Sequence, residues 1–302
     1  RISLLGEADL VLRVVRETAD HDAGQALDTL EPNEMPLEQA HSKDEHPRLM
    51  LEPGPPVFTS GRIQRRGHDL EVDGPAFVGV DEEAVVPVAD VVAKMAKLPM
   101  AAQPGEQWVY GYNTDILGVV VEKISGQSLD VFFKQRLIDP LGMTDTSFCL
   151  PPEKAERLAV VYSAKDGKSE RAPDPGSWVG SGHIGQGHYL NGPCKAFAGG
   201  AGLLSTARDY SRFLEMLRQG GVFEGRRYLS RKSVEQMSQD ALATATFQPG
   251  QGFGLGFRIT EDPGAMGNLG SKGDYGWGGA YHSTYWIDPA EGLTVAFMTQ
   301  LI

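Results

Sequence analysis

The sequence predicts an α+β fold, with helices in the middle of the chain and an antiparallel sheet towards its end. Apolar residues recur at helical spacing in several segments between residues 88 and 217. After residue 253, apolar residues alternate instead with small or polar residues, which is typical of strands. Helices followed by antiparallel strands indicate an α+β domain, and we find no internal repeat. We therefore divide the chain into an unassigned segment, 1–86, and one folded domain, 87–302.

Residues 1–86 carry little structural signal. Leu10 to Val15 is rich in β-branched residues and predicts a short strand. From Glu17 to about Gly74 the sequence shows neither a helical nor a strand period, so we expect a polar loop. This stretch contains His41, Asp44, Glu45 and His46. Because no second ligand cluster with metal-site spacing accompanies them, we interpret them as solvated loop residues and predict no metal site.

The first two expected helices flank a turn at Pro104-Gly105. Pro87 suits the first position of one helix, which Pro99 ends. Its apolar positions are Val88, Val91, Val92, Met95 and Leu98. Asn113 is a good N-cap for the next helix, and Gly126 supplies its C-terminal stop. The buried face of this second helix is expected to contain Ile116, Leu117, Val120, Val121 and Ile124.

Two further helices are expected on either side of a long surface excursion. Ser128 caps one of them, which closes near Gly142, and its inner face should contain Leu129, Phe132, Phe133 and Leu137. Thr206 and Asp209 have capping-box spacing for the other, which ends at Gly220-Gly221. The expected inner face of that helix is Ala207, Tyr210, Phe213, Leu214 and Leu217.

The segment between these two helices is expected to be irregular. The end of the chain is expected to form strands. Residues 151–198 are rich in Pro, Gly and Ser, and Gly199–Gly202 forms a flexible turn. The expected strands are Phe253–Ile259, Ala280–Ile287 and Leu293–Leu301, with a hairpin turn at Asp288–Gly292 before the last.

Composition excludes several function classes. The formal net charge is -12, so the surface repels phosphate backbones and anionic membranes, and we expect no nucleic-acid partner. No apolar run approaches the roughly 18 residues of a membrane span. Cys149 and Cys194 are too few for a disulfide framework, and neither belongs to a CxxC pair. We expect two buried or half-buried thiols, with a single disulfide as the alternative.

Both ends of the chain have the features of an interrupted domain. Residue 1 is arginine and no charged-then-apolar signal peptide follows it, while Met298 to Ile302 lie inside an apolar run. We therefore expect a domain truncated at both ends. The compartment is left open, with the cytoplasm slightly favoured, and so is the oligomeric state.

Common catalytic motifs of other families are missing from the sequence. It contains no GxSxG elbow, no HExxH, no P-loop and no GxGxxG fingerprint. Gly252–Gly256 is glycine-rich, but its glycines alternate with apolar residues, as in a tightly packed strand.

A series of short motifs between Val88 and Ile302 nevertheless follows an order known from one family. The helical part contributes Leu98-Pro99, Pro104-Gly105, Trp108–Tyr110, Asp115–Gly118, Ser125–Leu129 and Pro140–Thr146. The later part contributes Gly199–Ala207, Gly252–Phe257, Tyr275–Ala280 and Tyr285–Pro289. The series resembles the β-lactamase-related family of class C β-lactamases, DD-peptidases and family VIII carboxylesterases. Trp277-Gly278-Gly279, where the lactamases have Lys-Thr-Gly, is similar to the esterase branch.

The resemblance implies a β-lactamase/transpeptidase-like fold, an antiparallel sheet with helices and an inserted helical subdomain. Residues 87–302 would be the C-terminal portion of this hydrolase domain, after an atypical or incomplete N-terminal part. It also implies cleavage of a small-molecule ester or amide through an acyl-enzyme, with small carboxylic esters as substrates and no cofactor.

The resemblance assigns roles to residues of the family's second motif, a Tyr-x-x element at Tyr110–Tyr112, and of its third motif, Trp277-Gly278-Gly279. Tyr110 occupies the position of the tyrosine that relays protons, and Tyr112 stands where many relatives have Asn. Trp277, Gly278 and Gly279 would line the substrate cleft. The backbone N–H of Ala280 would donate to the developing oxyanion.

The family's first motif, Ser-x-x-Lys, is absent, because no serine of this sequence has lysine three positions later. The nucleophile is therefore unknown, and two hypotheses stay open. The chain is either a serine hydrolase with a nucleophile in another context, or a catalytically inactive or truncated relative that at most binds a ligand.

Several other polar residues are expected to be structural. Ser205 lies at a helix start and Lys272 in a solvated loop. The histidines His183, His188 and His282 have no partners at a metal-site spacing. Tyr281 and His282 follow the third motif, so substrate contact is the less favoured alternative for them.

Overall fold

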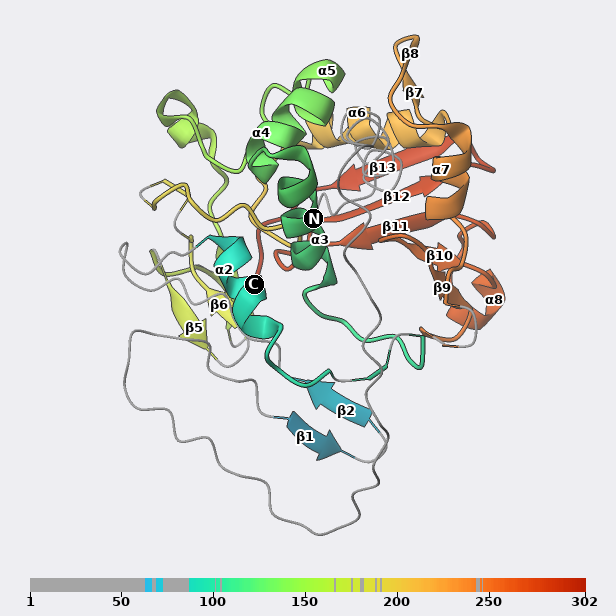
Figure 1. Ribbon diagram of the computed structural model, residues 1–302, viewed down its shortest axis with the longest axis horizontal. Coiled ribbons are helices and arrows are strands. Elements are labelled where there is room, and N and C mark those ends of the chain that lie inside the picture. The colour runs from blue at the N-terminus through green and yellow to red at the C-terminus, as the bar shows by residue number, and fades with distance from the viewer. Residues whose placement is uncertain are drawn as a thin grey trace, which may run out of the picture.

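The computed structural model describes residues 63–66, 69–72 and 87–302, apart from positions 101, 104, 166, 175, 180, 181, 188, 191, 243, 244 and 246. Figure 1 shows a group of helices beside an antiparallel sheet formed by the last third of the chain. The helices are α2 (Val88–Met95), α3 (Asn113–Ser125), α4 (Leu129–Phe133), α5 (Asp139–Leu141), α6 (Ala207–Arg218), α7 (Arg231–Met237) and α8 (Pro263–Met266). The predicted α+β fold is confirmed.

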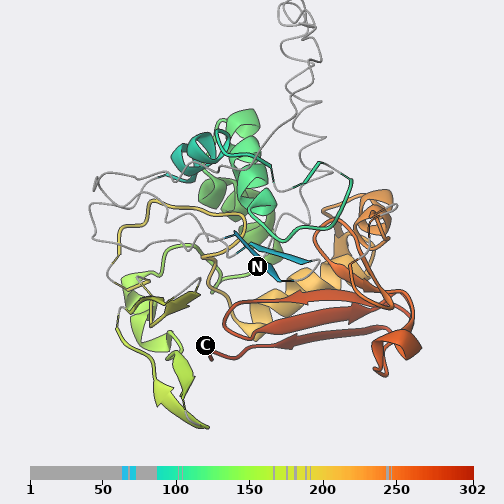
Figure 2. The same ribbon diagram turned by 90° about the horizontal axis from the view of Figure 1, so that it is seen from below.

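The main sheet of the described residues has five strands in the order β13-β12-β11-β10-β9, all antiparallel. They are β9 (Gln251–Phe253), β10 (Arg258–Thr260), β11 (Tyr275–Gly278), β12 (Thr284–Asp288) and β13 (Leu293–Phe297). Helix α6 lies along one face of this sheet, as Figure 2 shows, and packs against β12 and β13. The core fills the space between them and extends to α4.

Helix α3 has the predicted end but a different start and inner face. Gly126 ends it in the left-handed conformation, at φ 66°, whereas Asn113 is its first helical residue and not its N-cap. The exposed fractions of Ile116, Leu117 and Val120 are 38%, 45% and 37%, so the predicted buried face is wrong at these positions. The inward residues are Asp115, Gly118 and Val121.

The physical reason for this orientation is a close approach by the glycine-rich turn. A Cβ at Gly118 would lie 3.0 Å from a Leu129 methyl carbon and 3.4 Å from the Gly199 nitrogen. The turn and α4 therefore pack directly on the backbone of α3, which places its small residues inward. Apolar periodicity alone favours the opposite face.

The helix that follows Ser128 is confirmed, with one irregularity. It runs through α4, a π-helical segment η2 (Lys134–Ile138) and α5, and ends at Gly142. The predicted inner residues Leu129, Phe132, Phe133 and Leu137 are all buried. Ser128 holds the N-cap position without a side-chain cap, and Glu122 Oε1 accepts from the Leu129 N–H at 2.9 Å.

Helix α6 begins as the capping-box spacing predicts. Thr206 accepts from the Asp209 N–H at 3.2 Å, and the helix ends just before Gly220, whose φ is 64°. Four of the five predicted inner residues are buried, but Ala207 is exposed, because it lies in the first turn beyond the edge of the core. The carboxylate of Asp209 is buried in its place.

The strand predictions need correction in three places. The strand expected at Ala280–Ile287 begins only at Thr284, because a turn follows β11, and the one expected at Leu293–Leu301 ends at Phe297. Phe253–Ile259 is not a single strand but the hairpin β9–β10, in which the Gly254 N–H donates to the Phe257 carbonyl at 2.8 Å. A Cβ at Gly254 would lie 2.1 Å from the Met237 carbonyl oxygen, so the hairpin packs against the end of α7 and needs glycine at this position. The hairpin turn after β12 is confirmed, and Asp288 Oδ1 accepts from two N–H groups in it.

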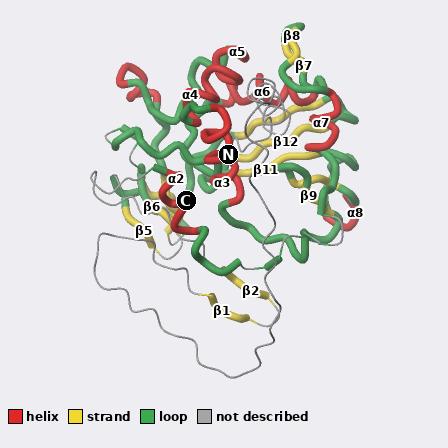
Figure 3. The backbone as a smooth tube through the Cα atoms, viewed as in Figure 1, coloured by secondary structure: helices red, strands yellow, loops and turns green. Residues whose placement is uncertain are grey.

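The surface excursion between α5 and α6 contains more order than expected, although Figure 3 shows that most of it is loop. It holds the 3-10 turn η3 (Pro152–Arg157) and two hairpins, β3 (Tyr162–Lys165) with β4 (Lys168–Arg171) and β5 (Ser177–Val179) with β6 (Gly182–Ile184). The Gln186 side chain bonds the two residues that flank the β3–β4 hairpin. Its Oε1 accepts from the Val161 N–H, and its Nε2 donates to the Val161 and Ala172 carbonyls.

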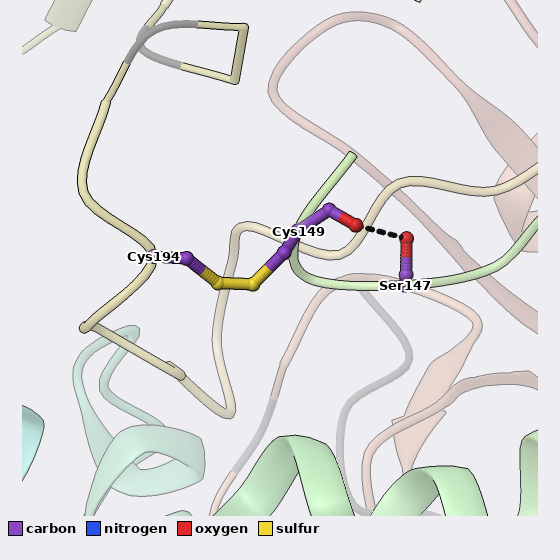
Figure 4. Close-up of a disulfide and its surroundings, with 3 residues drawn as sticks. All are labelled: Ser147, Cys149 and Cys194. Carbon is purple, nitrogen blue, oxygen red and sulfur yellow. Dashed lines mark hydrogen bonds between the residues drawn. A yellow bond between two sulfur atoms is a disulfide. The ribbon is translucent and has the colours of Figure 1, made fainter. Parts of the chain in front are cut away.

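Cys149 and Cys194 form a disulfide that ties the two ends of this excursion together (Figure 4). Their Cα atoms are 5.8 Å apart, within the usual range for a disulfide. The favoured expectation of two thiols was wrong, because the excursion returns to its starting point in space, a proximity that sequence separation does not reveal.

In the N-terminal segment, the expected uninterrupted loop is wrong at one place. Strands β1 (Ile63–Arg66) and β2 (Asp69–Val72) form a short antiparallel hairpin; four residues each are too few to show a period. A second short hairpin, β7 (Val222–Phe223) with β8 (Arg226–Arg227), follows α6. The strand expected at 10–15 and the polar group at His41, Asp44, Glu45 and His46 lie outside the described residues.

Candidate functional site

Tyr110 lies on the segment that leads into α3, and its side chain is 49% exposed. Its ring is nearly parallel to that of Trp277 on β11, with the planes at 16° and the ring centroids 6.3 Å apart. The residues of the second and third motifs, which are far apart in the sequence, are therefore neighbours in space. This adjacency is what a shared site requires, while their catalytic roles remain predictions.

Tyr112 is half-buried at the start of α3. Burial raises its pKa well above the ordinary value for a phenol, and the nearby Asp115 carboxylate raises it further. At neutral pH, Tyr112 is therefore a protonated phenol that can donate a hydrogen bond but cannot act as a base. The raised pKa makes Tyr112 a poorer proton acceptor than an ordinary tyrosine, and its predicted substrate contact stays a prediction.

Asp115 anchors this end of α3. Its carboxylate is buried and its Oδ1 accepts from the Gly200 N–H at 3.0 Å. A Cβ at Gly200 would lie 2.7 Å from Asp115 Oδ2, so the contact requires glycine. The Asp115–Gly200 contact holds the tyrosine-bearing segment in place; sequence reasoning missed it because the two residues belong to separate motifs.

The third motif lies where β11 loses one of its neighbours. The β10 strand pairs with Tyr275 and Gly276 only, whereas β12 pairs with all four residues from Tyr275 to Gly278. β11 is thus an interior strand at its start and an edge strand at Trp277 and Gly278. This open end faces the segment that carries Tyr110.

Ala280 is exposed in the turn that follows β11. In this turn the Gly279 N–H donates to the Ser283 carbonyl at 2.7 Å, and the His282 N–H donates to the Gly279 carbonyl at 3.0 Å. No backbone carbonyl of the described residues accepts from the Ala280 N–H. The oxyanion role of this amide stays a prediction.

Three further aromatic rings surround Tyr110 and Trp277. Together the five residues Trp108, Tyr110, Phe247, Phe253 and Trp277 form what we call the aromatic cluster. Trp108 lies 4.6 Å from Phe247 and 5.3 Å from Phe253 between ring centroids. Sequence reasoning missed Phe247, because no pattern marks a lone aromatic residue in an irregular segment.

Ser205 is structural, as expected. Its Oγ lies 2.8 Å from Thr146 Oγ1, which donates to Asp209 Oδ2 at 2.9 Å. The serine thus belongs to the polar network beneath the start of α6. No serine of the 302-residue sequence has a lysine three residues later, so the family's nucleophile motif has no counterpart here.

The remaining polar candidates are also accounted for where they are described. Lys272 is exposed and lies 3.4 Å from a Glu261 carboxylate oxygen. The His282 ring bonds the Leu301 carbonyl at 2.8 Å. The side chains of His183 and His188 lie outside the described part of the chain. Among the residues that are described, no three His, Cys, Asp or Glu side chains gather as a metal site, and no helix is long and apolar enough to span a membrane.

The chain is similar in sequence to known proteins, including an esterase. Protein Rv1367c of Mycobacterium tuberculosis is 33% identical over 221 residues, which cover 69% of this chain and 52% of that protein. Esterase EstB of Burkholderia gladioli is 31% identical over 220 residues, or 68% of this chain and 53% of the esterase. The chain therefore spans about half the length of the curated relatives it matches.

Solved structures give the same result. EstCE1, described as a hydrolase with promiscuous acyltransferase activity, superposes with a TM-score of 0.62 at 25% identity. The match covers 72% of this chain and 57% of EstCE1. The Beta-lactamase family model matches residues 56–301. By this match, and by the fold it shares with esterase and acyltransferase relatives, the chain belongs to the Beta-lactamase family.

Proposed function

We propose that this chain carries the proton-transfer and oxyanion side of a carboxylesterase site, which cleaves small carboxylic esters through an acyl-enzyme. The observation that supports this most is the stacking of Tyr110 against Trp277 beside the exposed Ala280 amide. Similarity to EstB, an esterase, supports the same reaction class. Trp277-Gly278-Gly279 also matches the esterase form of the third motif.

The roles follow from the chemistry of ester cleavage. A serine hydroxyl attacks the ester carbonyl, and its proton passes to the Tyr110 oxygen while the Ala280 N–H stabilises the oxyanion. The C–O bond to the alcohol then breaks, and the alcohol leaves with the proton from Tyr110. Water attacks the acyl-enzyme by the same route in reverse order and releases the acid.

Tyr110 needs help to act as a base. With a reference pKa of about 10, only ~0.1% of an ordinary tyrosine is phenolate at pH 7. Making up a deficit of three units would take about 4 kcal/mol. A positive charge next to the phenol supplies such help, and the missing Ser-x-x-Lys lysine would have been that charge.

The second candidate is a site that binds an ester or acyl group without turning it over. The absence of Ser-x-x-Lys favours it, because the covalent route is closed without a serine that can be acylated. The Tyr110–Trp277 pair and the Ala280 amide would then hold a carbonyl ligand without forming a bond to it.

Labelling with a fluorophosphonate serine probe, followed by intact-mass measurement, separates the two candidates. The esterase proposal predicts one adduct per chain, formed about 10²–10⁴-fold more slowly in Tyr110→Phe. Tyr162→Phe is the matched control, because Tyr162 is similarly exposed but lies on the separate β3 hairpin. Peptide mapping of the adduct would identify the nucleophile.

A thermal melt on the same sample shows whether the chain is folded. A folded sample without any adduct contradicts the esterase proposal for this chain and favours binding without turnover. An adduct that forms equally fast in Tyr110→Phe would remove Tyr110 from the mechanism.

A further inference from the structure

The aromatic cluster differs from the other large group of rings in the molecule in its exposure. Phe257, Tyr210, Tyr275 and Tyr285 also pack ring against ring, and all four are at most 5% exposed. In the aromatic cluster none of the five side chains is buried. Those four rings belong to the core, whereas the aromatic cluster keeps ring surface in contact with solvent.

The two groups are continuous along one face of β11. Tyr275 and Trp277 are two residues apart on the strand, so their side chains point to the same face. Tyr275 contacts Phe257 in the core, while Trp277 meets Phe253 edge-on at 5.3 Å, at 89° between ring planes. The row of rings thus extends out of the core and ends beside the turn that holds Ala280.

The aromatic cluster is built from three separate segments, 108–110, 247–253 and 277. Phe247 touches rings from both other segments, with centroid distances of 4.6 Å to Trp108 and 6.0 Å to Trp277. Edge-to-face and tilted contacts at these distances are favourable, and a further flat ring can add to them. The five side chains carry no charge, which suits a neutral ligand.

We infer that the aromatic cluster is a ring-binding subsite that selects neutral carboxylic esters with an aromatic group close to the ester carbonyl. This inference rests on the proposed function and names its substrate class. Ala280 lies in the turn that begins directly after β11, so its amide and the Trp277 ring belong to adjoining parts of the chain. An ester whose carbonyl is only one or two bonds from its ring is the substrate class that this arrangement favours.

The test uses two ketones that cannot be hydrolysed, phenylacetone and cyclohexylacetone. Both have a carbonyl one carbon away from a six-membered ring, but only the first ring is flat and aromatic. We expect the 302-residue chain to bind phenylacetone more tightly, in titrations followed by ligand-observed NMR. Equal affinity for the two ketones, or no binding of either, would overturn the inference.

Phe247→Ala tests the subsite without touching the predicted chemistry. Removing this ring should weaken phenylacetone binding by about 2- to 12-fold and leave cyclohexylacetone nearly unchanged. Phe253→Leu keeps the volume but removes another ring, and covers the case in which Phe247→Ala unfolds. Tyr162→Ala, which removes an exposed ring on β3, is the control and should bind like the parent chain.

Tyr110→Phe separates this inference from the proposed function. It keeps the ring in the aromatic cluster and loses only the hydroxyl, so phenylacetone binding should persist even where probe labelling is lost. Unchanged phenylacetone affinity in both folded ring variants, Phe247→Ala and Phe253→Leu, would show that the cluster only packs the loop, and would overturn the subsite whatever the labelling result.

Discussion

The two halves of β11 have the same kind of sequence, an aromatic residue followed by glycine, in different surroundings. Tyr275 is 2% exposed, and a Cβ on Gly276 would lie 2.1 Å from the Tyr285 carbonyl oxygen. Trp277 is only partly buried, and the nearest atom to a Cβ on Gly278 is 3.2 Å away. The first pair is sealed between β10 and β12, whereas β10 has ended before the second.

The difference shows how one strand can serve both as scaffold and as site. Where two neighbours flank the strand, its aromatic residue fills the core and its glycine permits close packing. Where one neighbour is missing, the same residue types leave the ring partly exposed and the glycine less crowded. Changes on the sealed side should therefore lower stability, and changes at the open end should alter binding or labelling.

The largest loss of stability is expected in the core that the sealed half of β11 joins, at Phe132 on α4. Its side chain is 1% exposed, and Phe132→Ala should lower the free energy of unfolding by about 3–5 kcal/mol. Val131→Ala is a matched control on the outer face of the same helix and should stay within about 0.5 kcal/mol. Urea unfolding measures both, and equal losses would mean that α4 does not contribute to the core as described.

Gly276→Ala should be the next most harmful change. The added methyl group would collide with the backbone of β12, which cannot give way as a flexible side chain could. We expect a loss of about 1–3 kcal/mol in the free energy of unfolding, as for other overpacked sites. A variant as stable as the parent chain would show that β11 and β12 are not paired so closely.

A smaller effect is expected from the buried phenol of Tyr275 at alkaline pH. Burial raises its pKa above that of the unfolded chain, so the folded state holds the proton more tightly. The stabilisation is complete below about pH 10 and declines as the pH rises further. The free energy of unfolding of Tyr275→Phe, relative to that of the parent chain, should be about 1 kcal/mol higher at pH 10.5 than at pH 8.

Urea unfolding at the two pH values tests the sign of this effect. Other tyrosines with raised pKa values, such as Tyr112, contribute to the parent's loss at high pH, so only the difference between variant and parent is informative. A parent chain that loses no stability relative to Tyr275→Phe at pH 10.5 would contradict the buried, protonated phenol.

The sequence predicted the parts of the fold whose signal is local. The inner face of α4 follows from bulky apolar residues at helical spacing, and the cap of α6 from Thr206 and Asp209 three residues apart. The turn after β12 follows from Asp288, whose carboxylate accepts from nearby amides. In each case the deciding contacts lie within a few residues of one another.

The sequence failed where the deciding contact is long-range. The inward face of α3 depends on Gly118 and on the Asp115–Gly200 contact, which apolar periodicity cannot reveal. The pairing of Cys149 with Cys194 depends on how the excursion returns. Family motifs drew attention to Tyr110 and Trp277, but only the fold brings Phe247 between Trp108 and Trp277.

The smallest change in stability is expected at the open end, for Gly279→Ala. A Cβ there would meet nothing closer than 3.9 Å, and the residue does not have a left-handed conformation. The free energy of unfolding should therefore stay within about 0.5 kcal/mol of the parent value. The comparison with Gly276→Ala then tests whether the two ends of the β11 motif differ as the packing indicates.

Probe labelling and ligand binding should respond in the opposite order, more to Gly279→Ala than to Gly276→Ala. The methyl group of Gly279→Ala stands next to the Ala280 amide, so it should slow fluorophosphonate labelling, or weaken phenylacetone binding in a chain that is not labelled. Gly276→Ala, measured at a temperature where it is still folded, should affect either readout less. If Gly279→Ala instead lowers stability and leaves both readouts unchanged, the turn after β11 is scaffold, and the oxyanion role proposed for Ala280 is wrong.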